Sequence, residues 1–245
     1  MRIQVVLKGE RVPRHYHFPM SSLVKNALSV TNPDLVNTLY HFSDGKANKQ
    51  IKPFTGYVQM TDYELLDDEF IVRGEIRLTI SSPDVEFILH LYNGFIQQRE
   101  YRYKHFEFTV SHVKVLQEKL PQTGKVLCQT KSPIVIRNRE GEFLNIEDSD
   151  YLAELNYISN ECVKQLEGRS LYSPIKLTPV LMTKKVVQLK HEAFKKLNPQ
   201  HIMYLNSFHG SFILEGDPRD IRLLVQTGLG FRRSEFLGFI EFIHE

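Results

Sequence analysis

The sequence predicts an α+β fold in which the element order β-α-β-β-α-β occurs twice. In both halves, segments in which apolar residues alternate are interleaved with segments of helical spacing. A turn-forming stretch, Pro121-Gln122-Thr123-Gly124, separates the halves. This order of elements is that of a ferredoxin-like (RRM-like) domain. We therefore expect tandem ferredoxin-like domains at residues 1–121 and 122–245, which share their architecture but little sequence.

In the first half, Arg2 to Lys8 carries alternating apolar residues and is expected to form a strand. Ser21 and Ser22 are expected to cap a helix, which Asn32-Pro33 interrupts and which resumes toward residue 41. The remaining elements are two strands joined by an acidic turn at 67–68, a helix and a last strand, at 54–60, 70–80, 85–95 and 106–116.

The second half repeats the same order of elements. A turn at Arg139-Glu140-Gly141 separates its first strand from its first helix. The expected elements are a strand, a helix, two strands, a helix and a strand, at 126–136, 150–166, 175–189, 202–214, 218–226 and 236–243.

The composition indicates a soluble protein with enough apolar residues to bury two cores. Of the 245 residues, 42% are hydrophobic. The absence of an apolar run of about 18 residues and a start that reads as a strand predict a cytoplasmic protein with no membrane partner. Cys128 and Cys162 have no metal-ligand spacing; a disulfide stays open, but buried free thiols are favoured.

Charge is distributed unevenly along the chain. The formal net charge of +2 is too small to indicate nucleic-acid binding, which normally appears as a local basic patch. One such stretch exists, because residues 169–196 are rich in lysine with Glu192 as their one acidic residue. Within it, Lys184, Lys185 and Lys190 are candidates for phosphate contacts, and a solvated strand face is the alternative. His15 and His17 are expected at the surface or in RNA contacts rather than as metal ligands.

The segment from Gly228 to Phe239 is the most distinctive part of the chain. Glycine adopts backbone conformations that other residues avoid and allows a ligand to approach the main chain. Successive backbone N–H groups can form an anion-binding nest, to which Arg232 and Arg233 would add bidentate donors. A glycine-rich turn with a solvated charged tip is the competing interpretation.

The tandem order of elements and this segment resemble a known family. Gly228-Leu229-Gly230 and Gly238-Phe239 are similar to the glycine loop of CRISPR-associated endoribonucleases, which cut repeat RNA precursors into guide RNAs and belong to the repeat-associated RNA-binding (RAMP) superfamily. In this chain seven residues rather than five separate the two halves of the motif, and Ile240 occupies the position where the family motif has its last glycine. The resemblance implies that the loop binds RNA, through Gly228, Gly230, Arg232, Arg233, Ser234 and Gly238.

The resemblance also implies an active site in the first domain, separate from the loop. In the family a histidine follows the first helix and a lysine precedes the next strand, positions that His41 and Lys52 match. A tyrosine often accompanies them within the first helix; here that place holds Lys25, and Tyr40 could substitute or simply pack. An imidazole near neutral pH can act as base or acid, and Lys52 would stabilise the charge on the phosphate. A helix C-cap is the alternative role for His41.

The resemblance implies a metal-independent endoribonuclease that uses no cofactor. The resemblance implies 2′-hydroxyl attack on CRISPR repeat RNA, leaving 2′,3′-cyclic phosphate and 5′-hydroxyl ends. Membership of a CRISPR effector complex, and a monomer or a homodimer, stay open. A non-catalytic RNA-binding subunit and a small-molecule-binding regulator are the alternatives, since ferredoxin-like domains host many functions.

Overall fold

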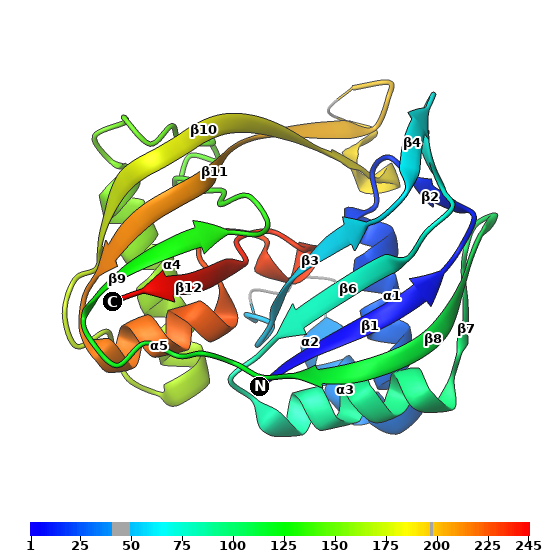
Figure 1. The fold of residues 1–245 in the computed structure, drawn as a ribbon. Coiled ribbons are helices and arrows are strands. Elements are labelled where there is room, and N and C mark those ends of the chain that lie inside the picture. Colours follow the sequence, from blue (N-terminus) through cyan, green and yellow to red (C-terminus); the bar gives the residue numbers. More distant parts are fainter. Residues whose placement is uncertain (41–49, 197) are drawn as a thin grey trace.

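Two antiparallel sheets with the same strand order organise the chain (Figure 1). The computed structural model describes residues 1–40, 50–196 and 198–245. The first sheet has the order β3-β6-β1-β8-β7, from strands β1 (Arg2–Lys8), β3 (Thr55–Met60), β6 (Ile76–Ser81), β7 (Glu100–Tyr103) and β8 (Phe106–Leu116). The second has the order β10-β11-β9-β12, from strands β9 (Lys125–Thr130), β10 (Lys176–Lys190), β11 (Ile202–Glu215) and β12 (Ile240–His244).

The shared order identifies the fold of each half. If β7 is set aside, both sheets place the second strand of the unit at an edge, followed by the third, the first and the fourth. All neighbouring strands in them are antiparallel. The prediction of two ferredoxin-like units is therefore confirmed.

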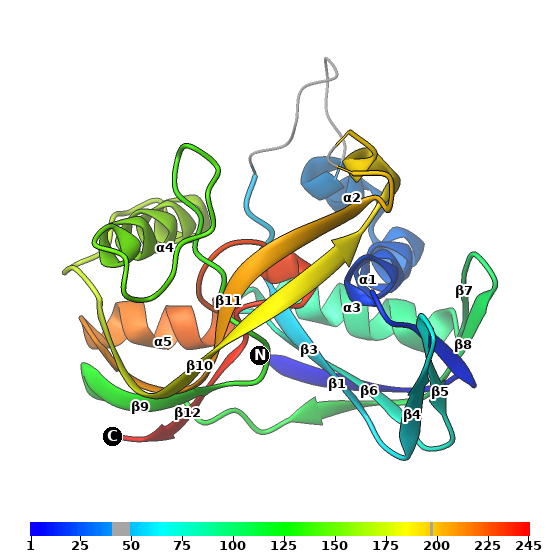
Figure 2. The same ribbon diagram turned by 90° about the horizontal axis from the view of Figure 1, so that it is seen from above.

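Helices cover one face of each sheet, and they lie on the same side of both sheets (Figure 2). The helices are α1 (His17–Thr31), α2 (Pro33–Tyr40) and α3 (Val85–Gln97) in the N-terminal unit, and α4 (Tyr151–Glu167) and α5 (Pro218–Thr227) in the C-terminal unit. Local sequence explains where they begin: Asp84 accepts a hydrogen bond from the Phe87 amide, and Asp217 accepts one from the Arg219 amide. No described helix is long and apolar enough to cross a membrane.

Each unit has its own apolar core, and a third cluster lies at their junction. The N-terminal core packs α1 and α3 on the first sheet, whereas the C-terminal core packs α4 and α5 on the second. The junction cluster combines residues of both β10 and β11 with Val135 and Leu237, and Phe18 of α1 packs against it. Cys128 and Cys162 are both buried free thiols.

The structure corrects several predicted boundaries. Helix α1 begins at His17 rather than after Ser21, because the Ser21 hydroxyl bonds the carbonyls of His17 and Ser234 instead of capping the helix. The predicted strand at 70–80 is two strands, of which β6 joins the first sheet and β5 (Glu69–Val72) a small one. That sheet, with β2 (Arg11–Pro13) and β4 (Tyr63–Leu66), was not predicted.

The β10–β11 hairpin spans the gap between the units and rests on the N-terminal one (Figures 1 and 2). The Lys190 ammonium lies 3.1 Å from the Asp68 carboxylate. The Phe18 ring packs at a tilt against His191 and Phe194, with its centre 4.7 and 5.9 Å from theirs. The hairpin thus joins the units at a second place, remote from the segment that links them in sequence.

His15 and His17 are buried at this junction, so their expected surface location is wrong. The His15 ring nitrogen lies 3.2 Å from the Gln188 carbonyl of the hairpin, and Nδ1 of His17 lies 2.8 Å from the Glu235 carbonyl. Because a carbonyl can only accept, Nδ1 of His17 carries the hydrogen. Burial lowers the pKa of His17 to about 4, against the partial compensation of that hydrogen bond.

The buried imidazole of His17 should make stability depend on pH. The unfolded chain binds a proton near pH 6.5 and the folded chain only near pH 4. Stability is therefore complete above about pH 6.5 and is lost as the pH falls, by about 1.4 kcal/mol per pH unit in that window. His17→Asn keeps a donor but does not titrate, so urea unfolding between pH 6 and 4.5 should show a shallower dependence. Equal slopes for the two proteins would contradict this assignment.

Candidate active site

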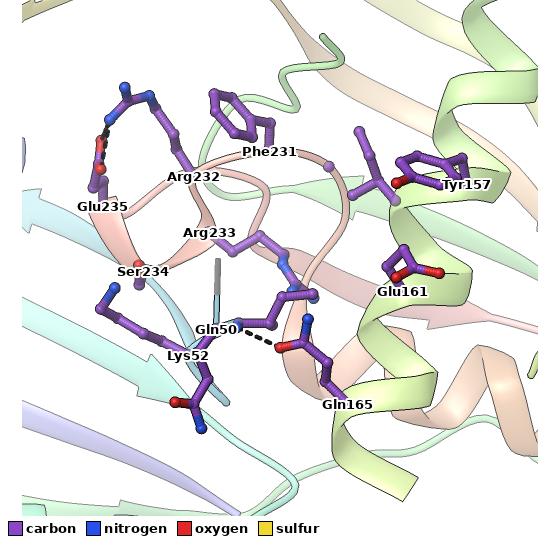
Figure 3. Close-up of a pocket in the computed structure, with 13 residues that line it drawn as sticks. Gln50, Lys52, Tyr157, Glu161, Gln165, Phe231, Arg232, Arg233, Ser234 and Glu235 are labelled. Carbon is purple, nitrogen blue, oxygen red and sulfur yellow. Dashed lines mark hydrogen bonds and ion pairs between the residues drawn. The ribbon is translucent and has the colours of Figure 1, made fainter. Parts of the chain in front are cut away.

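A cavity of about 530 Å³ opens between the two units (Figure 3). Three segments far apart in sequence form its walls: residues 50–52 before β3, one face of α4, and the glycine-rich loop from Gly230 to Glu235. The Ile51 amide donates a 2.6 Å hydrogen bond to the Gln165 side chain of α4, which joins two of these walls. The cavity is thus built jointly by both ferredoxin-like units.

Backbone conformation explains why the loop needs its glycines. Gly228, Gly230 and Gly238 have φ angles of +79°, +85° and +69°, which side chains other than glycine rarely adopt. A Cβ atom on Gly238 would overlap the Leu229 carbonyl oxygen. The Leu229 amide donates to the Gly238 carbonyl at 2.8 Å, so the two glycine-containing ends of the loop are held together.

The loop is wedged between the units and does not project into solvent. The fully buried Phe236 packs in the N-terminal core, and the Thr55 hydroxyl donates a 2.9 Å hydrogen bond to the Leu237 carbonyl. The predicted start of the last strand at residue 236 is therefore wrong. Phe236 and Gly238 have positive φ, and β12 begins at Ile240.

The two arginines of the loop do not form an exposed tip. Arg232 is held by the Glu235 carboxylate at 2.6 Å. Arg233 is 93% buried, and its guanidinium donates to the Cys162 sulfur at 2.7 Å. The Ser234 carbonyl accepts from Ser21. The interpretation of the loop as a turn with a solvated charged tip is therefore wrong. Packing buries this segment, because it supplies Phe236 to the N-terminal core.

Arg233 is a buried cation that has no counter-ion among the residues the structure describes. Among the described residues, no carboxylate forms an ion pair with its guanidinium, which always carries its charge. Figure 3 shows the side chain running from the loop toward Gln165 and the α4 wall. A buried charge that lacks a partner is unfavourable, so the cavity offers an anion a favourable electrostatic environment.

Lys52, Tyr40 and Lys25 lie close together in the N-terminal unit, and of the three Lys52 lines the cavity. The ammonium groups of Lys52 and Lys25 lie 4.8 and 5.6 Å from the centre of the Tyr40 ring. Burial lowers the pKa of Lys52; the Glu235 carboxylate opposes this and Arg232 adds to it. Residues from α1, from the end of α2 and from the segment before β3 therefore meet at one place.

Tyr40 fits a packing role better than proton transfer. Its hydroxyl is buried without a hydrogen-bond partner among the described residues. Burial raises its pKa well above the ordinary value. His41, the predicted acid or base, follows Tyr40 in sequence and lies outside the described residues. Its role stays a prediction.

The structure places one of the predicted catalytic residues, Lys52, beside the glycine-rich loop. Lys52 lines the same cavity as Gly230, Arg233 and Ser234. Lys52 and the loop belong to different halves of the sequence, but β3, which follows Lys52, runs beside the loop. Thr55 of β3 donates to the Leu237 carbonyl of the loop, and the Gly56 carbonyl accepts from Ser132 of the C-terminal unit. Lys52 and the loop residues from Gly230 to Glu235 therefore line one cavity.

The basic residues of β10 do not form one patch. Lys184 donates to the Asn145 side chain at 2.8 Å, and Lys190 is paired with Asp68. Lys185 instead lines a second cavity, of about 350 Å³, between the hairpin and β3. Successive residues of a strand point to opposite faces, so the three lysines serve different surroundings.

One wall of the larger cavity was missed from the sequence. Tyr157, Glu161 and Gln165 of α4 line it, and their four-residue spacing places them on one helix face. The opposite face is apolar, with Leu155, Cys162 and Val163 buried. A polar stripe at this spacing was the available signal. No group of three or more His, Cys, Asp or Glu side chains in the described residues is arranged to hold a metal ion.

Comparison with known proteins identifies the family of the chain. The model described as CRISPR associated protein Cas6, C-terminal, matches residues 116–242, just over half of the sequence. The chain belongs to the Cas6 family. The expected family is thus confirmed, and the glycine-rich loop lies within the matched residues.

Individual relatives agree with this assignment. A CRISPR-associated endoribonuclease Cas6 from Methanocaldococcus jannaschii is 26% identical over 165 residues, or 65% of this chain. The chain spans 59% of the length of that relative. A solved structure of a Cas6-related gene product from Pyrococcus furiosus has a TM-score of 0.83 at 18% identity, covering 100% of this chain and 99% of its own. A RAMP protein described as binding different RNA substrates has a TM-score of 0.82 at 18% identity, with 100% of both chains covered.

The wedge geometry of the Cas6 glycine loop predicts unequal costs for two glycine substitutions. Gly238 and Gly168 have the same φ of +69°, but a Cβ on Gly168 would meet open space. Gly168→Ala should cost about 1–2 kcal/mol of unfolding free energy for the left-handed backbone. Gly238→Ala should cost about 1–3 kcal/mol more, because the Leu229 carbonyl must move. Urea denaturation measures both, and equal losses would contradict the proposed constraint.

Proposed function

We propose that this Cas6-family protein is a metal-independent endoribonuclease that cleaves CRISPR repeat RNA. The 2′-hydroxyl of the RNA attacks the neighbouring phosphate, leaving a 2′,3′-cyclic phosphate and a 5′-hydroxyl end. The observation that carries the proposal is that Lys52 and Arg233 line the same cavity, while the Arg233 guanidinium forms no ion pair within the described part of the chain. The endoribonuclease relative from Methanocaldococcus jannaschii supports the same activity.

Charge stabilisation is the contribution that Lys52 and Arg233 are suited to make. The attack places an additional negative charge on the phosphate oxygens in the transition state. Preorganised cations in a site shielded from water stabilise such charge more than they would in bulk water. Lys52 is partly buried, which lowers its pKa, and Arg233 is held in place by Cys162 and the Gly228 carbonyl.

Proton transfer is assigned to His41 in this proposal. The reaction needs a base for the 2′-hydroxyl and an acid for the leaving 5′-oxygen, each typically worth about 10²–10⁴-fold in rate. Tyr40 is not given this role, because its buried hydroxyl has a raised pKa. In the non-catalytic alternative, the same cavity binds RNA while His41 serves only as a structural residue.

Cleavage should persist in excess chelator and require the 2′-hydroxyl. Labelled repeat RNA incubated with protein and EDTA should give 2′,3′-cyclic phosphate and 5′-hydroxyl ends. A single 2′-deoxy substitution at the cleaved position should abolish the reaction without abolishing binding. RNA retention with no cleavage would instead support the non-catalytic subunit, and neither activity would support a small-molecule-binding protein. Cleavage of the 2′-deoxy RNA would exclude the mechanism.

Removing the ammonium of Lys52 should slow the chemical step more than it weakens binding. Loss of one electrostatic donor at a reacting oxygen typically costs about 10²–10³-fold in kcat, and we expect this for Lys52→Ala in single-turnover cleavage. Lys52→Arg keeps the charge and should retain more activity. Lys8→Ala removes an exposed lysine of β1 and serves as the control. Equal cleavage rates for Lys52→Ala and Lys8→Ala would remove Lys52 from the mechanism.

Charge reversal on β10 should separate the roles of its neighbouring lysines. The double variant Lys184→Glu, Lys185→Glu should bind RNA more weakly and with a flatter salt dependence. Of these two lysines, Lys185 lines the second cavity and Lys184 does not. Lys185→Glu alone should therefore account for most of the loss of affinity. It should also reduce the salt slope by about one unit per phosphate contact removed. Affinities that match wild type across a salt series would show that this strand merely faces solvent.

A further inference from the structure

The α4 wall of the cavity differs in chemistry from the cationic side formed by Lys52 and Arg233. Tyr157 and Glu161 lie one helical turn apart and both line the cavity, and Figure 3 shows them on α4, across the cavity from Lys52. A tyrosine ring and a carboxylate do not attract a phosphate. This wall is therefore suited to another part of a nucleotide.

Tyr157 presents an aromatic surface that is already associated with arginine. The residue is 46% exposed although it belongs to a helix with a well-packed inner face. The Arg139 guanidinium lies 4.8 Å from the centre of its ring. Nearby in the cavity lining, the Phe231 ring has the Arg137 guanidinium 5.5 Å from its centre. Aromatic rings with adjacent arginines are the surfaces on which proteins stack unpaired RNA bases.

Glu161 offers a hydrogen-bond acceptor beside that surface. Its Oε1 is bound by Lys164 at 2.9 Å, whereas Oε2 has no partner among the described residues. A carboxylate accepts hydrogen bonds from the exocyclic amino groups of bases, as Glu does from cytosine N4. It repels the carbonyl oxygens that uracil presents at its pairing edge. Glu161 is thus placed to discriminate between bases.

We propose that Tyr157 and Glu161 form a nucleobase subsite for an unpaired base next to the phosphate held by Lys52 and Arg233. The base stacks on Tyr157 and donates from its amino group to Glu161, so cytosine, adenine and guanine are preferred to uracil. The cavity volume of about 530 Å³ lies within the roughly 300–1,000 Å³ of sites that enclose small organic ligands. The inference rests on the proposed function, because the phosphate is that of the cleaved bond.

The test uses repeat RNA made non-cleavable by a 2′-deoxy group at the mapped cleavage position. Tyr157→Ala should raise the Kd of the intact RNA by about 5- to 100-fold, the range for loss of one stacked base. Leu152→Ala, which truncates an exposed residue of α4 outside the cavity lining, should leave the Kd unchanged. RNA with an abasic nucleotide beside the cleaved bond should bind wild type as weakly as intact RNA binds Tyr157→Ala. The variant should show no further loss with the abasic RNA.

The base preference is tested with four RNAs that differ only at that nucleotide. Wild type should bind the uracil form most weakly, and Glu161→Gln, which gains a donor, should lose this preference, whereas Glu154→Gln on the same helix should keep it. If wild type binds and cleaves RNA but Tyr157→Ala matches Leu152→Ala, the subsite is wrong and the nuclease proposal stands. The subsite is also wrong if the abasic and intact RNAs bind alike. If wild type does not bind repeat RNA, both proposals fall.

Discussion

The position of the glycine-rich loop between the two units is the constraint on which the site depends. Phe236 of the C-terminal unit completes the N-terminal core, and Thr55 and Ser21 of the N-terminal unit bond loop carbonyls. Protein cores are close-packed and tolerate little displacement. The loop therefore holds the units in one relative arrangement, and the cavity walls keep their spacing. The β10–β11 hairpin, docked through Lys190 and its junction cluster, adds a second attachment.

The same wedge explains the electrostatics of the cavity. Two consecutive residues of the loop have different partners, since Arg232 pairs with Glu235 while Arg233 is buried against Cys162. Lys52 is brought to the same cavity because β3 passes beside the loop. Glycine in this loop permits a tight, buried path, because a Cβ on Gly228, Gly230 or Gly238 would meet neighbouring protein atoms.

Most of the fold could be predicted because periodicity and capping are local signals. The hairpin of β10 and β11, helix α3 with its Asp84 cap and the break at Pro33 follow the sequence pattern closely. The small sheet of β2, β4 and β5 was missed because its strands have only 3, 4 and 4 residues, too few for an alternating pattern to identify them. The start of α1 was misplaced because Ser21 is a cap residue by type, yet bonds Ser234 across the interface. That choice depends on a partner 213 residues away.

By itself the sequence determined the two ferredoxin-like units, the family and the residue types available for RNA chemistry. These depend on spacing within short segments, on the glycine motif and on Lys52 preceding a strand. Only the tertiary structure decided that the loop is buried, that Lys52 and Arg233 share a cavity and that Tyr157 and Glu161 form its other wall. The structure also decided that Lys184 and Lys185, neighbours on β10, have different surroundings, since Lys184 donates to Asn145 and Lys185 lines the second cavity. Burial, ion pairing and the direction in which a side chain points depend on contacts between segments that are distant in sequence, and local sequence patterns do not encode such contacts.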